Sequence, residues 1–311
     1  MSEFICKVYN KDFKERFLTD ININQYPPRW WERVFEKVYP FEKQKDKDLF
    51  EFTTPEIIEF YKFLDVSSLE SLIVYNANLT KYGQWALNNN LINDNQNHFS
   101  ELDNDVLFSC VNANKLENSV FNLEEFKDII YSIKNDQDKF VFFCLFEGIK
   151  GKNYEDIVNM RLSDIDIKNK TVKLHSGRTV SVSTDFITTA IDANNQKIYE
   201  NYGNNNLQRN LIPSDKIYKE KSNSNGADTP RTVYNTIVRN FKELGRADFT
   251  SNKMIRNSGL IYYLNKRADE LQVSVKDLFY DPDKAKDIFE KYNFNLQTRV
   301  RFLLIYGQFL K

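Results

Sequence analysis

The chain lacks the features that mark several classes of protein. It contains no apolar run near the roughly 20 residues that a membrane-spanning helix needs, and Met1–Phe4 does not have the basic-then-apolar form of a signal peptide. Its three cysteines, Cys6, Cys110 and Cys144, lie far apart in the sequence, so we expect buried reduced thiols instead of disulfides or metal ligands. The sequence therefore predicts a cytoplasmic protein with no metal site, no cofactor and no membrane partner.

An excess of charge of one sign is also lacking. The 43 Lys and Arg residues are balanced by 44 Asp and Glu residues, for a net charge of −1, whereas a protein that binds nucleic acid is usually basic overall. The balance is uneven along the chain: residues 1–100 hold about 12 basic and 15 acidic residues, and residues 205–256 hold about 10 and 5. Any positive surface for an anionic partner is therefore expected to be local.

Length and composition predict two folded domains. The chain has 311 residues, of which 41% are hydrophobic and 14% aromatic, which is enough for two separate cores and excludes general disorder. We expect a helical N-terminal extension over residues 1–47, with Pro28 in the first turn of a helix. A small helical domain is expected over residues 48–105, an acidic and irregular linker over 106–120, and a larger domain over 121–311.

The larger domain shows mainly helical patterns around a short β segment. The alternating stretches Thr171–His175 and Arg178–Val182 predict a β-hairpin that turns at Ser176–Gly177, and Leu211–Pro213 suggests a third short strand. Residues 214–228 have no pattern and are expected to form a mobile loop. The predicted helices are Phe140–Phe146, Asn153–Leu162, Thr184–Ile191, Lys197–Tyr202, Pro230–Leu244, Asn252–Lys266, Val273–Phe279 continuing at Asp283–Tyr292, and Gln297–Phe309. The fold class is thus mainly α with a small β-hairpin or three-stranded sheet (α+β).

Three short segments of the larger domain resemble the signature boxes of the tyrosine recombinases, the family of the phage integrases. Lys253–Ser258 is similar to the box His-x-Leu-Arg-His-Ser, and Met160–Ile165 to the Leu-x-x-Ser-Asp-Ile run that follows the first catalytic Arg. Asn293–Phe302 resembles the last box, in which a His precedes the nucleophilic Tyr by nine residues. The resemblance covers roughly residues 50–311 and implies a two-domain clamp, with residues 48–105 as the core-binding domain.

The resemblance also shows which catalytic positions have changed. Phe302 stands at the place of the nucleophile, and a phenyl ring has no hydroxyl with which to attack a phosphodiester. The first Arg is absent, whether its place is taken by Asn153 or, with three inserted residues, by Lys150. Of the remaining positions, only Arg256 keeps its residue type. The degenerate catalytic positions are Asn153, Arg178, Lys253, Arg256, Asn293 and Phe302.

Cationic and amide side chains at these places still suit contact with a phosphate. The residues expected to bind DNA phosphates are Lys150, Lys152, Arg178, Lys253, Arg256, Asn257 and Asn293. In the recombinases the helix before the second box enters the major groove, where Arg pairs with guanine and Asn with adenine. The residues expected to read bases are therefore Arg231, Thr232, Asn235, Arg239 and Lys242.

The resulting hypothesis is a sequence-specific protein for double-stranded DNA that does not cut it, and hence a transcriptional repressor of a phage or prophage. As a stand-alone protein that has lost these catalytic residues, the chain resembles the lysogeny repressors of the SPbeta-like prophages of Bacillus. That resemblance implies a homodimer on DNA and a protein anti-repressor as partners. One alternative is an active, divergent recombinase that uses Tyr306 or Tyr292, and a second is a structural or protein-interaction role.

Overall fold

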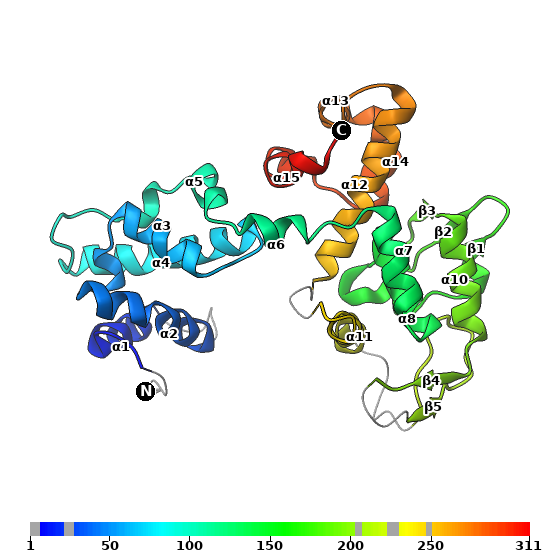
Figure 1. Cartoon of the computed structure of the whole chain (residues 1–311), viewed down its shortest axis with the longest axis horizontal. Helices are drawn as coiled ribbons and strands as arrows, with labels where there is room; N and C mark the ends of the chain where they lie inside the picture. The colour runs from blue at the N-terminus through cyan, green and yellow to red at the C-terminus, as the bar shows by residue number, and fades with distance from the viewer. Residues whose placement is uncertain (1–6, 22–27, 203–206, 223–229, 247–250) are drawn as a thin grey trace. The chain divides into compact units, whose positions relative to one another are not determined.

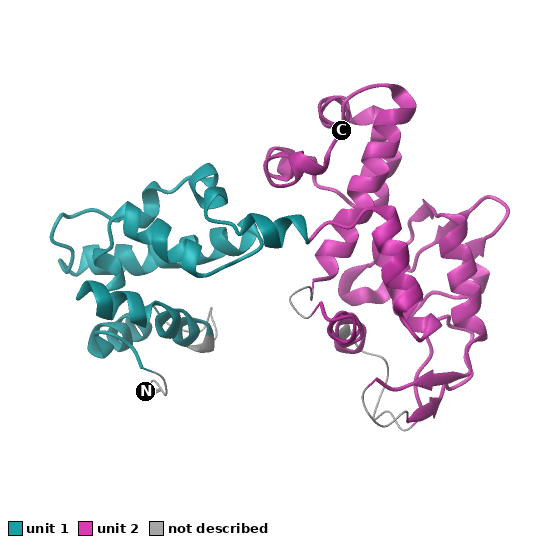
Figure 2. Ribbon diagram, in the orientation of Figure 1, with its two compact units in different colours: residues 1–118 teal, residues 119–311 magenta. Residues whose placement is uncertain are grey.

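The computed structural model describes residues 7–21, 28–202, 207–222, 230–246 and 251–311. The chain forms two compact units, residues 1–118 and residues 119–311 (Figure 2). Both are mainly helical, and the second also carries two small antiparallel sheets, so the predicted fold class is confirmed. No helix in the described ranges is long and apolar enough to cross a membrane.

The first four helices of unit 1 are labelled in Figure 1, and aromatic side chains from them form the core of the unit. The ring of Phe17 lies 4.8 Å from Trp31 and 4.8 Å from Tyr82, centre to centre. The predicted N-terminal extension therefore shares one core with the predicted helical domain. The helices are α1 (Lys11–Asp20), α2 (Pro28–Lys45), α3 (Thr54–Phe63) and α4 (Leu69–Asn88), with 3-10 turns η2 (Leu49–Glu51) and η3 (His98–Glu101).

A buried charge network also joins the elements of unit 1. Lys14 Nζ lies 2.7 Å from Glu42 Oε1 and 3.0 Å from Asp48 Oδ2, and all three side chains are fully buried. Tyr82 donates a hydrogen bond to Asp48 Oδ1 at 2.9 Å. Burial raises the pKa of Glu42 to about 7, because removing a carboxylate from water disfavours its charged form.

The prediction of an irregular linker over residues 106–120 was wrong for most of that range. It contains the end of α5 (Asn104–Ser109) and all of α6 (Ala113–Glu117). Both helices begin at residues whose side chains cap them: Asp103 accepts from the backbone N–H of Val106 at 2.9 Å, and Asn112 from that of Lys115 at 3.0 Å. Some of the polar residues that suggested a linker are therefore residues that cap helices.

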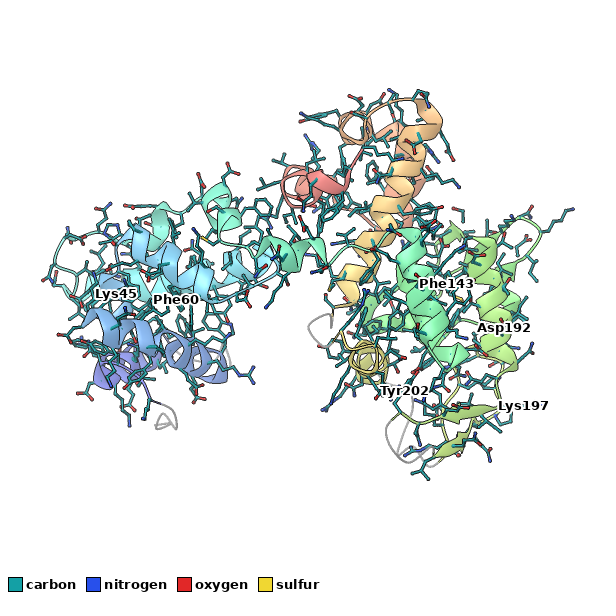
Figure 3. All side chains as sticks on the ribbon, viewed as in Figure 1. Lys45, Phe60, Phe143, Asp192, Lys197 and Tyr202 are labelled. Atoms are coloured by element: carbon teal, nitrogen blue, oxygen red, sulfur yellow. The ribbon has the colours of Figure 1, made fainter. Side chains whose placement is uncertain are left out.

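Unit 2 packs its helices around α8 (Asp136–Phe146), which is buried along the whole of Phe140–Phe146. Figure 1 shows α7 and α10 beside it, and α12 and α11 also contact it. Figure 3 labels Phe143 within this core and Phe60 within that of unit 1. The other helices of unit 2 are α7 (Leu123–Ser132), α9 (Glu155–Val158), α10 (Thr184–Asn195), α11 (Pro230–Glu243), α12 (Asn252–Leu271), α13 (Val275–Tyr280), α14 (Lys286–Lys291) and α15 (Arg299–Tyr306).

The predicted hairpin is confirmed, and a further strand extends it. β1 (Ile165–Asp166), β2 (Thr171–Lys173) and β3 (Thr179–Ser181) form an antiparallel sheet in that order, with Val172 opposite Val180. Gly177 has a φ of 86° at the tight turn, a conformation that favours glycine. The turn brings Arg178 to the start of β3.

Two other predictions in this region were wrong. Lys197–Tyr202 is not helical, because β4 (Ile198–Glu200) pairs with β5 (Gln208–Asn210). Leu211–Pro213 is not a strand either: β5 ends just before it, and Leu211 forms only an isolated β-bridge with Lys221. The side-chain amide of Asn135 holds β4, donating to the Glu200 carbonyl at 2.9 Å and accepting from its N–H at 2.8 Å. This pairing across the sequence overrides the local helical pattern.

The helices predicted around the signature boxes are shorter in the structure and are interrupted by 3-10 turns. Asn153–Leu162 contains only η4 (Lys152–Tyr154), α9 and the start of η5 (Leu162–Asp164). Ile217 and Tyr218 are buried, so the first part of the expected mobile loop is packed, while residues 223–228 lie outside the described ranges. The 3-10 turns η6 (Pro282–Ala285), η7 (Leu296–Thr298) and η8 (Gly307–Phe309) interrupt the C-terminal helices.

The cysteines behave as expected where they are described. Cys110 and Cys144 are buried and free, and Cys6 lies outside the described residues. Within the same part of the chain, no group of three or more His, Cys, Asp and Glu side chains could hold a metal ion.

Candidate nucleic-acid interface

Two arginines from distant parts of unit 2 meet at the C-terminal end of α14. Arg178 Nη1 donates to the carbonyls of Glu290 at 3.0 Å and Lys291 at 3.4 Å, and Arg256 Nη2 donates to the carbonyl of Tyr292. The last carbonyls of a helix have no partner within it and carry partial negative charge, so cations stabilise them. The β2–β3 turn and α12 are thereby tied to the residues that precede Asn293.

A buried carboxylate fixes one of these arginines. Asp156 is fully buried and lies 3.6 Å from Arg178 Nη2. It also accepts from the backbone N–H of Ser176 at 2.8 Å and from the Ser176 hydroxyl at 3.1 Å. Asp156 is absent from the predicted site residues. Through its contacts with Ser176 and Arg178, it positions the turn that carries Arg178.

Lys150 is a third cation of the same group. Burial lowers the pKa of Lys150, and the nearby charge of Arg256 lowers it further. Burial also lowers the pKa of Arg256, with a smaller contribution from the charge of Arg178. Lys150 Nζ also lies 5.2 Å from the centre of the Tyr154 ring. We call Lys150, Arg178 and Arg256 the basic cluster. A bound anion would lower the repulsion between cations that lie close together.

The strained loop before α9 distinguishes the two candidates for the place of the first catalytic Arg. Asn153 is exposed with a φ of 50°, and Tyr154 has a φ of 64°. Gly151 has a φ of 70°, and a Cβ there would lie 2.8 Å from the Asp156 carboxyl. This loop leaves Asn153 at the surface and Lys150 half-buried beside the Tyr154 ring.

The other predicted phosphate contacts differ in their exposure and partners. Lys152 and Lys253 are exposed, and Asn293 is exposed with a φ of 45°, two residues after the end of α14. Asn257 is different, because its side-chain amide donates to the hydroxyl of Tyr306 at 2.7 Å. The structure thus groups Lys150, Arg178 and Arg256 and gives Asn257 a partner within the protein.

The three aromatic residues proposed for the nucleophile position are all buried. Phe302 is 7% exposed, and its ring centre lies 5.6 Å from Phe279 and 5.3 Å from Phe294. Tyr292 is 2% exposed and donates its hydroxyl proton to the carbonyl of Phe146; burial raises its pKa well above the usual value. Tyr306 is 7% exposed and accepts the hydrogen bond from Asn257. The hydroxyls of Tyr292 and Tyr306 are both hydrogen-bonded within the protein.

One face of α11 carries most of the predicted base-reading residues. Arg231, Asn235 and Lys242 are exposed, and their spacings of four and seven residues place them on one stripe of the helix. Tyr234 is exposed beside them, and sequence reasoning missed it although its position in the helix was known. Thr232 is half-buried at the flank of this stripe.

Arg239 corrects the prediction for this helix. It lies 3.6 Å from the fully buried Asp138, donates to the Tyr199 hydroxyl, and lies 4.8 Å from the centre of the Tyr202 ring. Asp138 also accepts from Tyr199 at 2.8 Å, Tyr202 at 2.9 Å and Asn240 at 3.0 Å. Figure 3 shows Tyr202 close to α11. Arg239 therefore serves this internal network, where the sequence predicted a contact to bases.

Comparison with known proteins bears on both units. A family model described as "MrpR, C-terminal catalytic domain" matches residues 120–310, and one described as "MrpR, N-terminal core-binding domain" matches residues 8–88. The "SPbeta prophage-derived uncharacterized protein YopR" of Bacillus subtilis (strain 168) is 24% identical over 319 residues, which cover 96% of this chain and 92% of the relative. The solved integrase from mycobacterium phage Brujita is 11% identical, with coverage of 91% of this chain and 93% of the integrase and a TM-score of 0.33.

Proposed function

We propose that this chain, which belongs to the MrpR family, binds double-stranded DNA at specific sequences and does not cut it. The observation that carries the proposal is the combination of a basic cluster with a buried Phe302 at the place of the nucleophile. A recombinase-like fold with its cations grouped can hold a phosphate. Without a hydroxyl at that place, it has no group there to form a covalent bond to DNA.

In this proposal the basic cluster binds the DNA backbone. Arg178 and Arg256 would direct free N–H groups to a phosphate while keeping their bonds to the end of α14. The exposed Lys152, Lys253 and Asn293 would add contacts from the neighbouring elements. Such contacts fix the position of DNA but carry no sequence information.

Sequence would be read by the exposed stripe of α11. Arg231 can pair with guanine through two hydrogen bonds, and Asn235 can do the same with adenine. Lys242, in the last turn of the same helix, would contact a base edge or the adjacent phosphate. Arg239 takes no part, because its guanidinium is engaged with Asp138 and Tyr199.

The chemistry of strand cleavage is disfavoured at several positions together. A phosphoryl-transfer transition state gathers negative charge, and losing one fixed donor costs on the order of 10² to 10³ in rate. Arg178 stands at the hairpin position that a Lys occupies in the recombinases, and a guanidinium group does not give up its proton as a general acid must. These losses, added to Phe302, support binding without reaction.

A DNA-binding protein without chemistry acts by occupying its site, and we propose that this chain is a transcriptional repressor of a phage or prophage. The prophage-derived relative supports that setting. A homodimer on paired half-sites and a protein anti-repressor are further parts of the proposal. Footprinting across the parent genome tests it: protected sites with paired half-sites support a dimeric repressor, and no site bound better than random DNA would contradict it.

One observation favours a second candidate, an active recombinase that uses Tyr306. Its hydroxyl accepts a hydrogen bond at 2.7 Å from the amide of Asn257, the residue next to Arg256, so the hydroxyl contacts the box Lys253–Ser258. Relaxation of a supercoiled plasmid by the wild-type chain but not by Tyr306→Phe would establish this candidate.

A further inference from the structure

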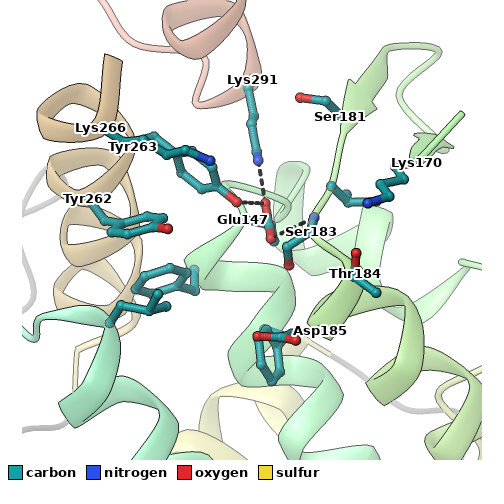
Figure 4. Close-up of a pocket in the computed structure, with 14 residues that line it drawn as sticks. Glu147, Lys170, Ser181, Ser183, Thr184, Asp185, Tyr262, Tyr263, Lys266 and Lys291 are labelled. Carbon is teal, nitrogen blue, oxygen red and sulfur yellow. Dashed lines mark hydrogen bonds and ion pairs between the residues drawn. The ribbon is translucent and has the colours of Figure 1, made fainter. Parts of the chain in front are cut away.

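Unit 2 contains a pocket of about 340 Å³ that the proposed DNA contacts do not use (Figure 4). It is lined by α8, α12, the residues around the start of α10, and Lys291 of α14. Its volume falls within the range of natural small-molecule sites, which are mostly apolar with a few convergent polar groups.

The two sides of the pocket differ in chemistry. Phe143, Phe146 and Tyr262 supply aromatic surface on one side. Figure 4 shows Lys170 and Thr184 on the other side, with Lys266 across from them. The pocket thus offers a flat apolar surface beside hydroxyl and ammonium groups, which suits a ligand with an apolar ring and a polar end.

A buried ion pair forms the inner wall. Glu147 is 1% exposed and receives Lys291 Nζ, the hydroxyl of Tyr263 at 2.7 Å and the backbone N–H of Ser183 at 3.1 Å. Figure 4 shows Lys291 and Tyr263 converging on this carboxylate. Lys291 Nζ also lies 3.9 Å from the centre of the Tyr263 ring.

The charges around the mouth favour an anion. Lys170 and Lys266 are exposed, and neither forms an ion pair with any residue in the described ranges. Asp185, the second carboxylate of the lining, is paired with Lys127 at 2.8 Å. With Glu147 neutralised by Lys291 and Asp185 by Lys127, two ammonium groups remain to attract a ligand of opposite charge.

We propose that this pocket binds a small organic anion, with its apolar ring against Phe143, Phe146 and Tyr262 and its charged end between Lys170 on one side of the pocket and Lys266 on the other. The anion class rests on the two lysines, and the aromatic wall selects ligands with a ring over inorganic ions. Nothing in the proposed contacts to DNA requires these residues.

Occupancy of the pocket also acts on the basic cluster, a consequence that rests on the proposed function. Lys291 reaches the pocket with its ammonium group, and its carbonyl accepts from Arg178 at 3.4 Å. The next carbonyl, that of Tyr292, accepts from Arg256. A bound anion that draws Lys291 from Glu147 would move the carbonyls that position both arginines, and so change the affinity for DNA.

Calorimetry with phenyl phosphate tests binding on the full chain. We expect a dissociation constant of about 1 mM or tighter, in line with the affinity per atom of small ligands, and at least tenfold weaker binding of phenol and of inorganic phosphate. Lys170→Gln with Lys266→Gln should weaken phenyl phosphate at least tenfold. The matched pair Lys168→Gln with Lys276→Gln, which changes two exposed lysines outside the pocket, should bind it as the wild type does.

The binding measurement has clear contrary results. Absence of binding at about 10 mM phenyl phosphate, equal affinity of the two double variants, or equal binding of inorganic phosphate would each overturn the pocket proposal. All four substitutions lie at exposed positions, so thermal melting of the variants should match that of the wild type.

Gel shifts with a footprinted site then test the link to DNA. Saturating phenyl phosphate should change the DNA dissociation constant at least threefold in the wild type and leave it unchanged in Lys170→Gln with Lys266→Gln. An equal change in both would mean direct competition at the basic cluster, and no change would refute the link. If the chain binds no DNA with or without phenyl phosphate, the proposed function fails while calorimetry still decides the pocket.

Discussion

Replacing Arg239 by Met separates a structural from a base-reading role for this residue. Met keeps most of the apolar stem and removes the guanidinium that lies 3.6 Å from the buried Asp138 and donates to Tyr199. If Arg239 serves the internal network, the variant should lose stability in unit 2. Its DNA sequence preference should stay as in the wild type.

The expected loss follows from what remains around Asp138. Removing the partner of a fully buried ion pair typically costs about 3 to 5 kcal/mol. Asp138 keeps hydrogen bonds from Tyr199, Tyr202 and Asn240, and the Arg239 side chain is 34% exposed, so we expect about 1 to 2 kcal/mol. For a unit of this size that corresponds to a fall in Tm of roughly 2 to 8 °C.

Thermal and chemical denaturation followed by circular dichroism measure this loss. Lys242→Met on the same helix is the matched control, since Lys242 is exposed, and we expect its effect to stay within about 0.5 kcal/mol. In a double-mutant cycle with Asp138→Asn, the two substitutions should be coupled, because each removes the same ion pair.

The contrary result is equally specific. An Arg239→Met variant that melts with the wild type and discriminates less between its site and single-base changes would show that Arg239 reads bases. The structural role of the Asp138 network would then be refuted.

Three further predictions concern other charged groups. Burial raises the pKa of Glu42 to about 7, so its protonated form stabilises unit 1 below pH 4.5, and this stabilisation is lost as pH rises to 7. All three tryptophans lie in unit 1, so denaturation followed by tryptophan fluorescence reports on this unit. Between pH 4.5 and 7 the free energy of unfolding should fall by about 2 to 3 kcal/mol less in Glu42→Gln than in the wild type. Lys291→Met should lower the free energy of unfolding of unit 2 by about 3 kcal/mol in denaturant melts, because it leaves the buried Glu147 carboxylate without its cation. Adding Glu147→Gln should recover much of this stability. Arg256→Ala should weaken binding to all DNA sequences in gel shifts and lower the salt slope by about 0.9; an unchanged slope would exclude a phosphate contact.

The sequence predicted the elements that local pattern determines. The helices that became α11 and α12 and the hairpin across Gly177 follow from apolar spacing and turn chemistry, and the structure has them near the predicted bounds. Lys197–Tyr202 failed because a strand of three residues has almost no period of its own. Its conformation depends on Asn135, which lies more than 60 residues away.

The candidate site was predictable in its residue types and less so in its partners. Arg178 and Arg256 were expected from the boxes, and their meeting at the end of α14 required the fold. Arg239 lies on the flank of the exposed stripe, where helical spacing alone does not separate an outward from an inward guanidinium. The buried pair of Glu147 and Lys291 was missed, although a charged residue ending an apolar run at Phe146 is a signal that could have drawn attention to Glu147.

Incubation of the protein with a supercoiled plasmid that carries a footprinted site tests the central claim most directly. A gel shift before denaturation should show the plasmid fully bound. Binding without cleavage predicts that, once the protein is denatured, the plasmid is still supercoiled and carries no covalently attached protein. Relaxed plasmid, or a protein–DNA adduct that disappears in Tyr306→Phe, would contradict the account and identify Tyr306 as a nucleophile.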